Sequence, residues 1–196
     1  MTRREASDSY GFPLMAKLLA PSKIGCAEIT HYTITKLDVL RELMHGGPCE
    51  ESTVAILRVN GRTVMSDTRH ERLTNWEIRA RAKGRVLVAG LGMGMIIHAL
   101  AKNAEVSSIT VVEKESDVIA LISPSLPKTE KLNVVCADIF KWAPAIGEKF
   151  DTIYFDIWAD ASNGAAAPDR RKLSARFRKH KAPEGWMGSW HPMDRR

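Results

Sequence analysis

The sequence predicts an α/β protein with a Rossmann-like, doubly wound and mostly parallel sheet, and three observations lead to this prediction. Short apolar runs typical of buried strands alternate with segments that have the apolar spacing of helices. Three closely spaced glycines directly follow the first of these strands. Single acidic residues follow the later strands, at the edge where open α/β sheets bind their ligands.

Four buried strands are predicted in the middle of the chain, over residues 85–89, 109–112, 132–136 and 150–157. Helices are expected over residues 95–102 and 116–122, and a short helix over 139–142 is expected to end at Pro144. Parallel strands need crossover connections. This alternation therefore predicts right-handed crossover units.

The residues before this core predict an extension built around a β-hairpin. Asn60-Gly61 is the strongest hairpin signal in the chain, and it predicts that residues 53–59 and 62–66 pair. A single helix over residues 70–82, capped by Asp67 or Thr68, is expected to lead into the core.

The first fifty residues carry weaker signals. Residues 1–9 are expected to be disordered, and one or two helical turns are expected over 14–20. A strand over residues 24–35 and a helix over 37–45, stopped at 46–48, complete the extension. The expected domains are therefore an extension (residues 1–83), a core (84–160) and a C-terminal segment (161–196).

Bulk properties indicate an ordinary globular protein. The chain has 196 residues, of which 44% are hydrophobic and 27% are charged. No apolar window is long enough for a transmembrane helix, and the polar N-terminus lacks the apolar stretch of a signal peptide. Three widely spaced cysteines indicate no disulfide framework, and the six histidines show no metal-ligand spacing. We expect a cytoplasmic protein without a metal site.

The C-terminal segment is basic. Residues 160–196 contain nine Lys or Arg against four Asp or Glu, most of them in a helix expected over 169–182. A solvated helix face is the simpler interpretation, and an anionic partner such as a nucleic acid, bound between Arg170 and Lys181, is the alternative. A last strand is expected within residues 185–190.

The glycine-rich turn carries the first chemical signal, in the segment Gly90-Leu91-Gly92-Met93-Gly94. Glycine permits tight backbone conformations and close approach of a ligand, and the following helix offers free N–H groups. A dinucleotide fingerprint requires glycine at position 95, where this chain has methionine. The spacing favours a nucleoside that carries an amino-acid carboxylate. Close packing of strand on helix is the structural alternative.

Three acids follow successive strands. Glu113 is placed to bind ribose hydroxyls, unless it is only a surface acid beside Lys114. Asp138 is placed either to hold an adenine amino group or to cap the next helix. Asp156 ends an apolar strand, where it could hold a cationic group or accept a proton, unless it serves only as a loop acid. Lys114 and Ile139 adjoin the first two acids and complete the expected nucleoside site.

These segments resemble the successive motifs of class I S-adenosylmethionine (SAM)-dependent methyltransferases over about residues 53–158. The hairpin before the sheet is similar to the spermidine-synthase-like branch. Residues 64–68 and 186–190 resemble short proteins of that branch from bacterial and phage genomes. The turn departs from the Gly-Gly-Gly-Asp-Gly-Gly pattern of spermidine synthases. Asp156 is followed by a second acid, Asp160, one place late, and the remaining chain has room for only one more helix and strand.

The resemblance implies that SAM, or decarboxylated SAM or methylthioadenosine, is the ligand. The glycines would pass along its methionine part, Glu113 would hold the ribose and Asp138 would face the adenine. In aminopropyltransferases the acid at the position of Asp156 helps take a proton from the attacking amine.

The leading hypothesis is therefore a SAM-binding transferase, a methyltransferase of undetermined acceptor. Aminopropyl transfer is the alternative enzyme activity. A non-catalytic, phage-type nucleoside-binding module whose basic C-terminus binds a partner is the alternative of another class. The apolar hairpin over residues 55–66 could pair two subunits in a homodimer.

Overall fold

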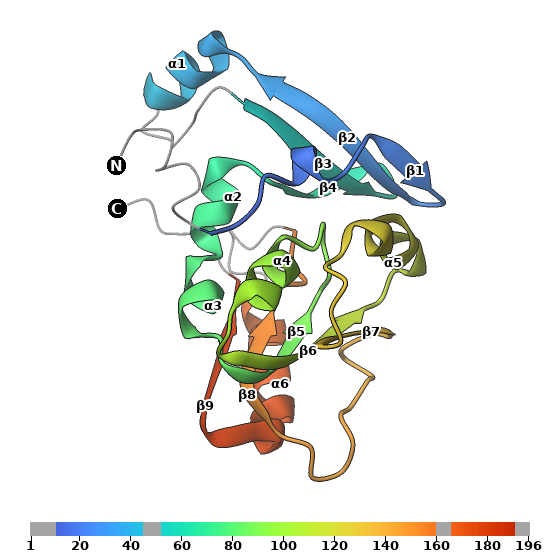
Figure 1. The fold of residues 1–196 in the computed structure, drawn as a ribbon, viewed down its shortest axis with the longest axis vertical. Coiled ribbons are helices and arrows are strands. Elements are labelled where there is room, and N and C mark those ends of the chain that lie inside the picture. Colours follow the sequence, from blue (N-terminus) through green and yellow to red (C-terminus); the bar gives the residue numbers. More distant parts are fainter. Residues whose placement is uncertain (1–10, 45–51, 160–165, 191–196) are drawn as a thin grey trace.

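The computed structural model describes residues 11–44, 52–159 and 166–190. These residues form a five-stranded parallel sheet and a four-stranded antiparallel sheet (Figure 1). The parallel sheet has the order β7-β6-β5-β8-β9. It comprises β5 (Gly84–Ala89), β6 (Val106–Glu113), β7 (Leu132–Cys136), β8 (Phe150–Phe155) and β9 (Lys181–Ser189). From β5 the chain adds β6 and β7 on one side, and it then adds β8 and β9 on the other side of β5. The doubly wound fold is therefore confirmed, with its switch point between β5 and β8.

The sheet is buried on both faces, as its apolar runs predicted. Val86 and Val88 of β5 belong to the hydrophobic cluster on one face, whereas Leu87 and Ala89 belong to the cluster on the other. All four are fully buried. This arrangement explains why β5 is a continuous apolar run and not an alternating pattern.

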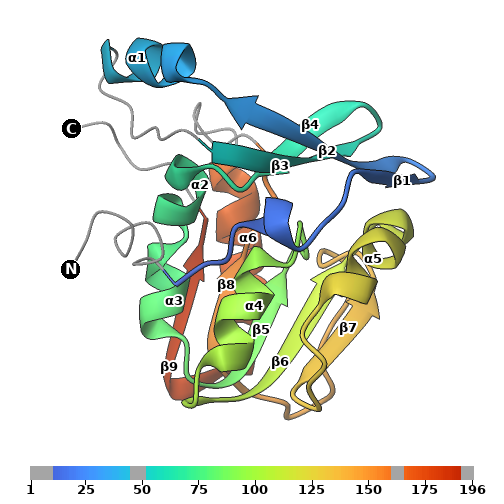
Figure 2. The same cartoon turned by 45° about the horizontal axis from the view of Figure 1, so that its top comes forward.

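Helices cover the two faces unequally (Figure 2). One face packs against α3 (Trp76–Arg81), α4 (Met95–Lys102) and α5 (Ser116–Ile122). The other face packs against α6 (Ala167–Phe177), which buries Leu173 and Phe177. A 3₁₀ turn, η3 (Arg178–His180), then leads into β9, which is parallel to β8. The predicted basic helix therefore ends five residues early, and the last strand begins four residues before the predicted one.

The extension is a sheet and not a lone hairpin. It comprises β1 (Ser22–Ile24), β2 (Ala27–Ile34), β3 (Ser52–Val59) and β4 (Arg62–Ser66), in that order. The predicted turn is confirmed, with φ of 51° at Asn60 and 74° at Gly61. The strand predicted over residues 24–35 is confirmed as β2, although it begins three residues later than predicted, because the chain turns at Gly25 between β1 and β2.

The extension lies across the carboxyl edge of the parallel sheet (Figures 1 and 2). Ile29, Ala55 and Leu57 belong to the same buried cluster as one face of the parallel sheet. The extension also contains the 3₁₀ turn η1 (Met15–Lys17) and α1 (Lys36–Met44), which confirm two expected elements. The predictions for residues 1–9 and 46–48 lie outside the described residues.

The single helix predicted over residues 70–82 is wrong. Two helices, α2 (Arg69–Thr74) and α3, meet at Asn75, whose side chain donates to the Glu71 carbonyl (3.1 Å) and accepts from the Tyr154 hydroxyl (3.3 Å). The interruption therefore lies at a residue that makes one local and one tertiary hydrogen bond. Thr68 is the N-cap, accepting from the Glu71 amide at 3.4 Å.

The short helix predicted over residues 139–142 is also wrong. Asp138 instead closes a turn, because its carbonyl accepts the amides of Lys141 and Trp142, each at 2.8 Å. The expected domain limits at residues 83 and 160 stay predictions. Among the described residues, no helix is both long and apolar enough to cross a membrane.

Candidate functional site

A cavity of about 450 Å³ lies where the extension covers the carboxyl edge of the parallel sheet. It brings together most of the residues that the sequence singled out: Gly90, Gly92, Glu113, Lys114, Asp138, Ile139 and Asp156. Leu91, Met93 and Gly94 are not among the described residues that line it. The extension adds an opposite wall formed by Leu57, Val59, Val64, Met65 and Glu71.

The glycine-rich turn joins β5 to α4. Gly90 has φ of 96°, and a Cβ there would overlap the carbonyl oxygen of Asp156. The two segments are bound in register, because the Asp156 amide donates to the Ala89 carbonyl at 2.8 Å. The side chains of Leu91 and Met93 belong to the buried hydrophobic cluster and anchor the turn to the core. Position 90 therefore requires glycine for close approach as well as for its backbone conformation.

Glu113, at the end of β6, holds the turn in place. One carboxylate oxygen accepts the Leu91 amide at 2.9 Å, and the other accepts the Glu115 amide at 2.9 Å. Each oxygen keeps a further lone pair, so the carboxylate can also accept hydroxyl donors from the cavity. The structure therefore adds a local role for Glu113, and its role towards ribose stays a prediction.

Asp138 and the turn after it are tied to α6. The Asp138 carboxylate accepts the Phe140 amide at 2.9 Å, so it caps a turn and not the helix predicted to begin at Ile139. The Arg176 guanidinium donates to three carbonyl oxygens of the turn: Ile139 (2.7 Å), Lys141 (3.0 Å) and Trp142 (2.6 Å). One charge of the basic helix therefore fixes a wall of the cavity, a role that no local sequence signal indicated.

Asp156 follows β8 and lies close enough to Glu71 of α2 for their charges to interact. Burial raises the pKa of Asp156 to about 7. Burial, and then the nearby Asp156 carboxylate, raise the pKa of Glu71 to about 8. Two such carboxylates can exchange protons near neutral pH. Glu71 was not predicted from the sequence, because an acid three residues after a Thr cap is an ordinary feature of a helix start.

The cavity carries a strong negative balance. Its described lining includes five acids, Glu71, Glu113, Glu115, Asp138 and Asp156, and one basic residue, Lys114. The Lys114 ammonium lies 3.5 Å from the Glu115 carboxylate. Low-dielectric walls strengthen the field of such a cluster. The cavity therefore favours a cationic ligand.

Met65 of β4 closes the cavity over the glycine-rich turn. Its sulfur accepts the Met93 amide at 3.1 Å, and a Cβ at Gly92 would overlap this sulfur. In the sequence, residues 64–68 stood out only as part of the resemblance. No sequence signal could place Met65 on the turn, because the contact joins segments 28 residues apart.

Of the five tryptophans, Trp76 is exposed, and the other four divide between the core and the cavity. Trp142 stacks on Phe177, Trp186 stacks on Tyr154, and the Trp190 indole donates to Thr74 at 2.9 Å. Trp158 lines the cavity, and its indole N–H has no hydrogen-bond partner among the described residues. Of the four, Trp158 is therefore the one placed to contact a ligand.

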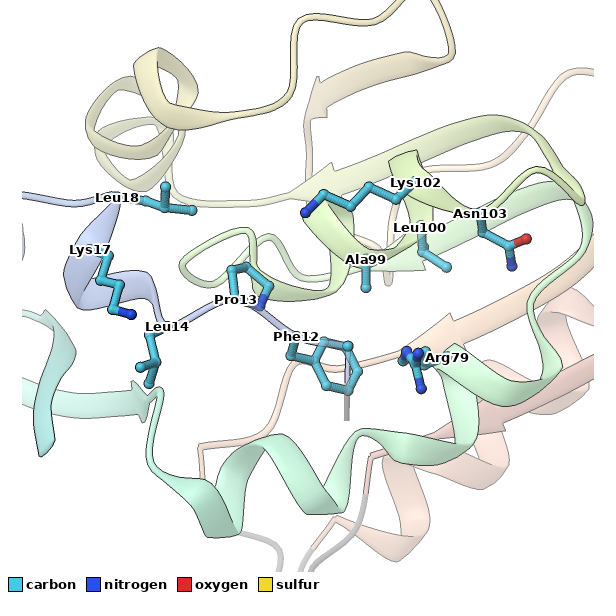
Figure 3. A pocket seen from close by; sticks show the side chains of 11 residues that line it. Phe12, Pro13, Leu14, Lys17, Leu18, Arg79, Ala99, Leu100, Lys102 and Asn103 are labelled. Carbon is cyan, nitrogen blue, oxygen red and sulfur yellow. The ribbon is translucent and has the colours of Figure 1, made fainter. Parts of the chain in front are cut away.

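A second cavity of about 740 Å³ lies on the outer side of α4 (Figure 3). Phe12, Leu14 and Leu100 contribute apolar groups, and Lys17 and Lys102 extend over them. None of the acids at the strand ends is among its described lining residues. The smaller cavity is therefore the candidate functional site.

Comparisons with known proteins agree with the expected branch. No protein-family model matches the chain. The chain is 35% identical over 95 residues to polyamine aminopropyltransferase of Pseudomonas syringae pv. tomato, and 34% identical over 95 residues to polyamine aminopropyltransferase 1 of Pseudomonas aeruginosa. Each match covers 44% of this chain and 33% of the relative. The chain therefore matches about a third of the length of these curated relatives.

Solved structures that resemble this chain include methyltransferases. They include the N-methyltransferase NodS from Bradyrhizobium japonicum (TM-score 0.45, 18% identity, 61% of this chain and 64% of that one). This protein was also crystallised with S-adenosyl-L-homocysteine. A SAM-dependent methyltransferase from Clostridium acetobutylicum has a TM-score of 0.42 and 17% identity, over 62% of this chain and 50% of that one.

Proposed function

We propose that the cavity binds SAM or a close relative and that the chain transfers a group from its sulfonium to an acceptor. The single observation that carries this proposal is the convergence of the glycine-rich turn with Glu113, Asp138 and Asp156 in one cavity at the switch point. In this proposal Glu113 accepts from the ribose hydroxyls and Asp138 faces the base.

The proposed chemistry needs alignment and a proton acceptor. The acceptor's lone pair forms a bond to the carbon attached to sulfur, while the carbon–sulfur bond breaks and its electron pair stays on the sulfur. A proton leaves the acceptor, and Asp156 or Glu71 takes it. Their raised pKa values suit a base that works near neutral pH. Holding the two reactants in line supplies the rest of the rate enhancement.

An amine is the acceptor class that the cavity favours. A protonated amine satisfies the negative charge that Glu71 and Asp156 carry when ionised, and loss of its proton to whichever of the two carboxyl groups is ionised produces the nucleophile. This charge pattern and the sequence similarity to polyamine aminopropyltransferases both favour aminopropyl transfer as the second candidate reaction. Methyl transfer to an amine uses the same residues.

Isothermal titration calorimetry tests the donor site. SAM, decarboxylated SAM, S-adenosylhomocysteine, methylthioadenosine and NAD are titrated into the wild type, into Glu113→Gln and into the matched control Glu130→Gln. Glu130 is an exposed acid outside the cavity. We expect a sulfonium nucleoside to bind, with an affinity at least about tenfold weaker in Glu113→Gln and unchanged in the control.

Acceptor assays follow with the ligand that binds. Turnover with an amine that Asp156→Asn abolishes, while donor binding persists, supports the transferase. Donor binding without turnover on any acceptor favours the nucleoside-binding module. Salt-dependent nucleic-acid binding that is lost when Arg171 and Lys172 are replaced indicates a nucleic-acid partner instead. Binding of none of the nucleosides refutes the proposed function.

A further inference from the structure

We propose that the acceptor is an amine that also carries a carboxylate, and that Arg170 of α6 binds this carboxylate. The inference rests on the proposed function, because it names the acceptor class of the same cavity. Glu71 and Asp156 line that cavity and can hold an amine, but they repel an anion. A carboxylate on the same molecule therefore needs a cation elsewhere, and the surroundings of Trp158 provide one.

Arg170 presents an unused pair of donors. Its guanidinium carbon lies 5.3 Å from the centre of the Trp158 ring, and its Nε and Nη2 are buried without a hydrogen-bond partner among the described residues. The indole N–H of Trp158 is also buried and unpaired within that part of the chain. A guanidinium keeps its charge at any ordinary pH, so each of these buried donors is costly until an acceptor binds it.

The neighbouring side chains do not neutralise Arg170. Burial raises the pKa of Asp156 to about 7, whereas a guanidinium in direct contact would lower it. Burial also raises the pKa of Tyr154, a rise that the charge of Arg170 opposes, but the Tyr154 hydroxyl donates its proton to Asn75 at 3.3 Å. Over the described ranges, no carboxylate forms an ion pair with Arg170. Its charge is therefore available to an anionic ligand.

The unpaired atoms indicate which anion fits. Nε and Nη2 form one edge of the guanidinium, and their N–H bonds along that edge are parallel. This edge matches the two oxygens of a carboxylate, which it binds through two charge-assisted hydrogen bonds. The Trp158 indole offers a third donor nearby. A second ammonium on the acceptor would instead meet the positive charge of Arg170.

Trp158 connects this edge to the cavity. It follows Asp156 by two residues, and both residues line the cavity. An acceptor whose amine lies at Glu71 and Asp156 can therefore extend its other end towards Arg170. The three donor atoms are covered in this structure, so the half-buried Trp158 ring must shift when the carboxylate enters. The carboxylate stays bound and takes no part in the transfer, while the amine loses its proton to the ionised carboxyl group.

Calorimetry with matched pairs of acceptors tests the inference. Ornithine and putrescine differ only in one carboxylate, and so do free lysine and cadaverine. Each is titrated into protein saturated with S-adenosylhomocysteine or methylthioadenosine, whichever binds in the donor titrations. We expect each amino acid to bind at least about tenfold more tightly than its diamine.

Variants of Arg170 separate its charge from its geometry. Arg170→Gln should weaken ornithine binding at least about tenfold without weakening that of putrescine, and it should raise the KM for ornithine more than it lowers kcat. Arg170→Lys keeps the charge but lacks the parallel donors, so it should restore only part of the affinity. Arg178→Gln is the matched control, because Arg178 is an exposed arginine at the other end of α6. Thermal melts verify that each variant is folded.

The outcomes separate this inference from the proposed function. If a nucleoside binds but ornithine binds no more tightly than putrescine, the inference alone is overturned. Equal losses of ornithine binding in Arg170→Gln and Arg178→Gln also overturn it. If Arg170→Gln weakens SAM but not decarboxylated SAM, the guanidinium binds the donor's carboxylate and not the acceptor's. Binding of none of the nucleosides overturns the proposed function and this inference together.

Discussion

Replacement of Glu71 by glutamine should change the pH dependence of stability. Burial and the Asp156 carboxylate raise the pKa of Glu71 from 4.5 to about 8, so the folded state holds its proton more tightly than the unfolded state does. Stability is therefore lost as pH rises from about 4.5 to about 8. The amide of the introduced glutamine stays neutral at every pH, so the substitution removes this loss.

The size of the effect follows from the shift. A change from 4.5 to about 8 corresponds to about 5 kcal/mol, at about 1.4 kcal/mol per pH unit. Solvent screening at the cavity mouth and the coupled titration of Asp156 reduce this value. We expect Glu71→Gln to be about 2 kcal/mol more stable than the wild type at pH 9 and nearly equal to it at pH 5.

Urea unfolding at pH 5, 7 and 9 measures this difference, with Glu130→Gln as the exposed control. The variant's stability relative to the wild type should increase steadily with pH, while the control stays parallel to the wild type. If Glu71→Gln also stays parallel to the wild type, the carboxyl group titrates normally. That result would refute the raised pKa of Glu71 and its charge interaction with Asp156.

Three further substitutions test the structure around the cavity. Gly90→Ala should lower the free energy of unfolding by more than about 2 kcal/mol in urea, because its Cβ overlaps the Asp156 carbonyl at a φ of 96°; an unchanged midpoint would contradict the close approach. Asp67→Ala should cost about 2–3 kcal/mol in the same assay, because the buried carboxylate accepts the Ala16 and Ala55 amides at 3.0 and 2.7 Å. Arg176→Gln should increase hydrogen exchange of the amides at residues 140–142 at least about tenfold, and unchanged protection would show that the guanidinium does not hold this turn.

The core and its ligand edge could be predicted because their signals are local. The run from Val86 to Ala89 is apolar at every position, which specifies a strand buried on both faces. Gly90 and Glu113 stand at strand ends, and in a parallel sheet all carboxyl ends meet at one edge. No knowledge of tertiary contacts is needed for either step.

The other wall of the cavity could not be predicted, because contacts between distant segments create it. The expected helix is interrupted at Asn75, whose side chain accepts from the Tyr154 hydroxyl, 79 residues away. That break determines how α2 presents Glu71. Met65 reaches the glycine-rich turn only after the extension packs as a four-stranded sheet. The sequence predicts the hairpin, because its turn is a local signal. It does not indicate which part of the core the hairpin packs against.

The extension changes what the acids of the core can do. An open parallel sheet would leave Asp156 in water, where its carboxylate would titrate normally and hold cations weakly. Leu57, Val59 and Val64 line the same cavity as Asp156, and burial raises the pKa of this carboxyl group to about 7. The same sheet leads into α2, which adds a second carboxylate to the enclosed space. A proton acceptor and a cation site therefore arise together from the docking of the extension, so variants that loosen the extension should weaken both before they unfold the core.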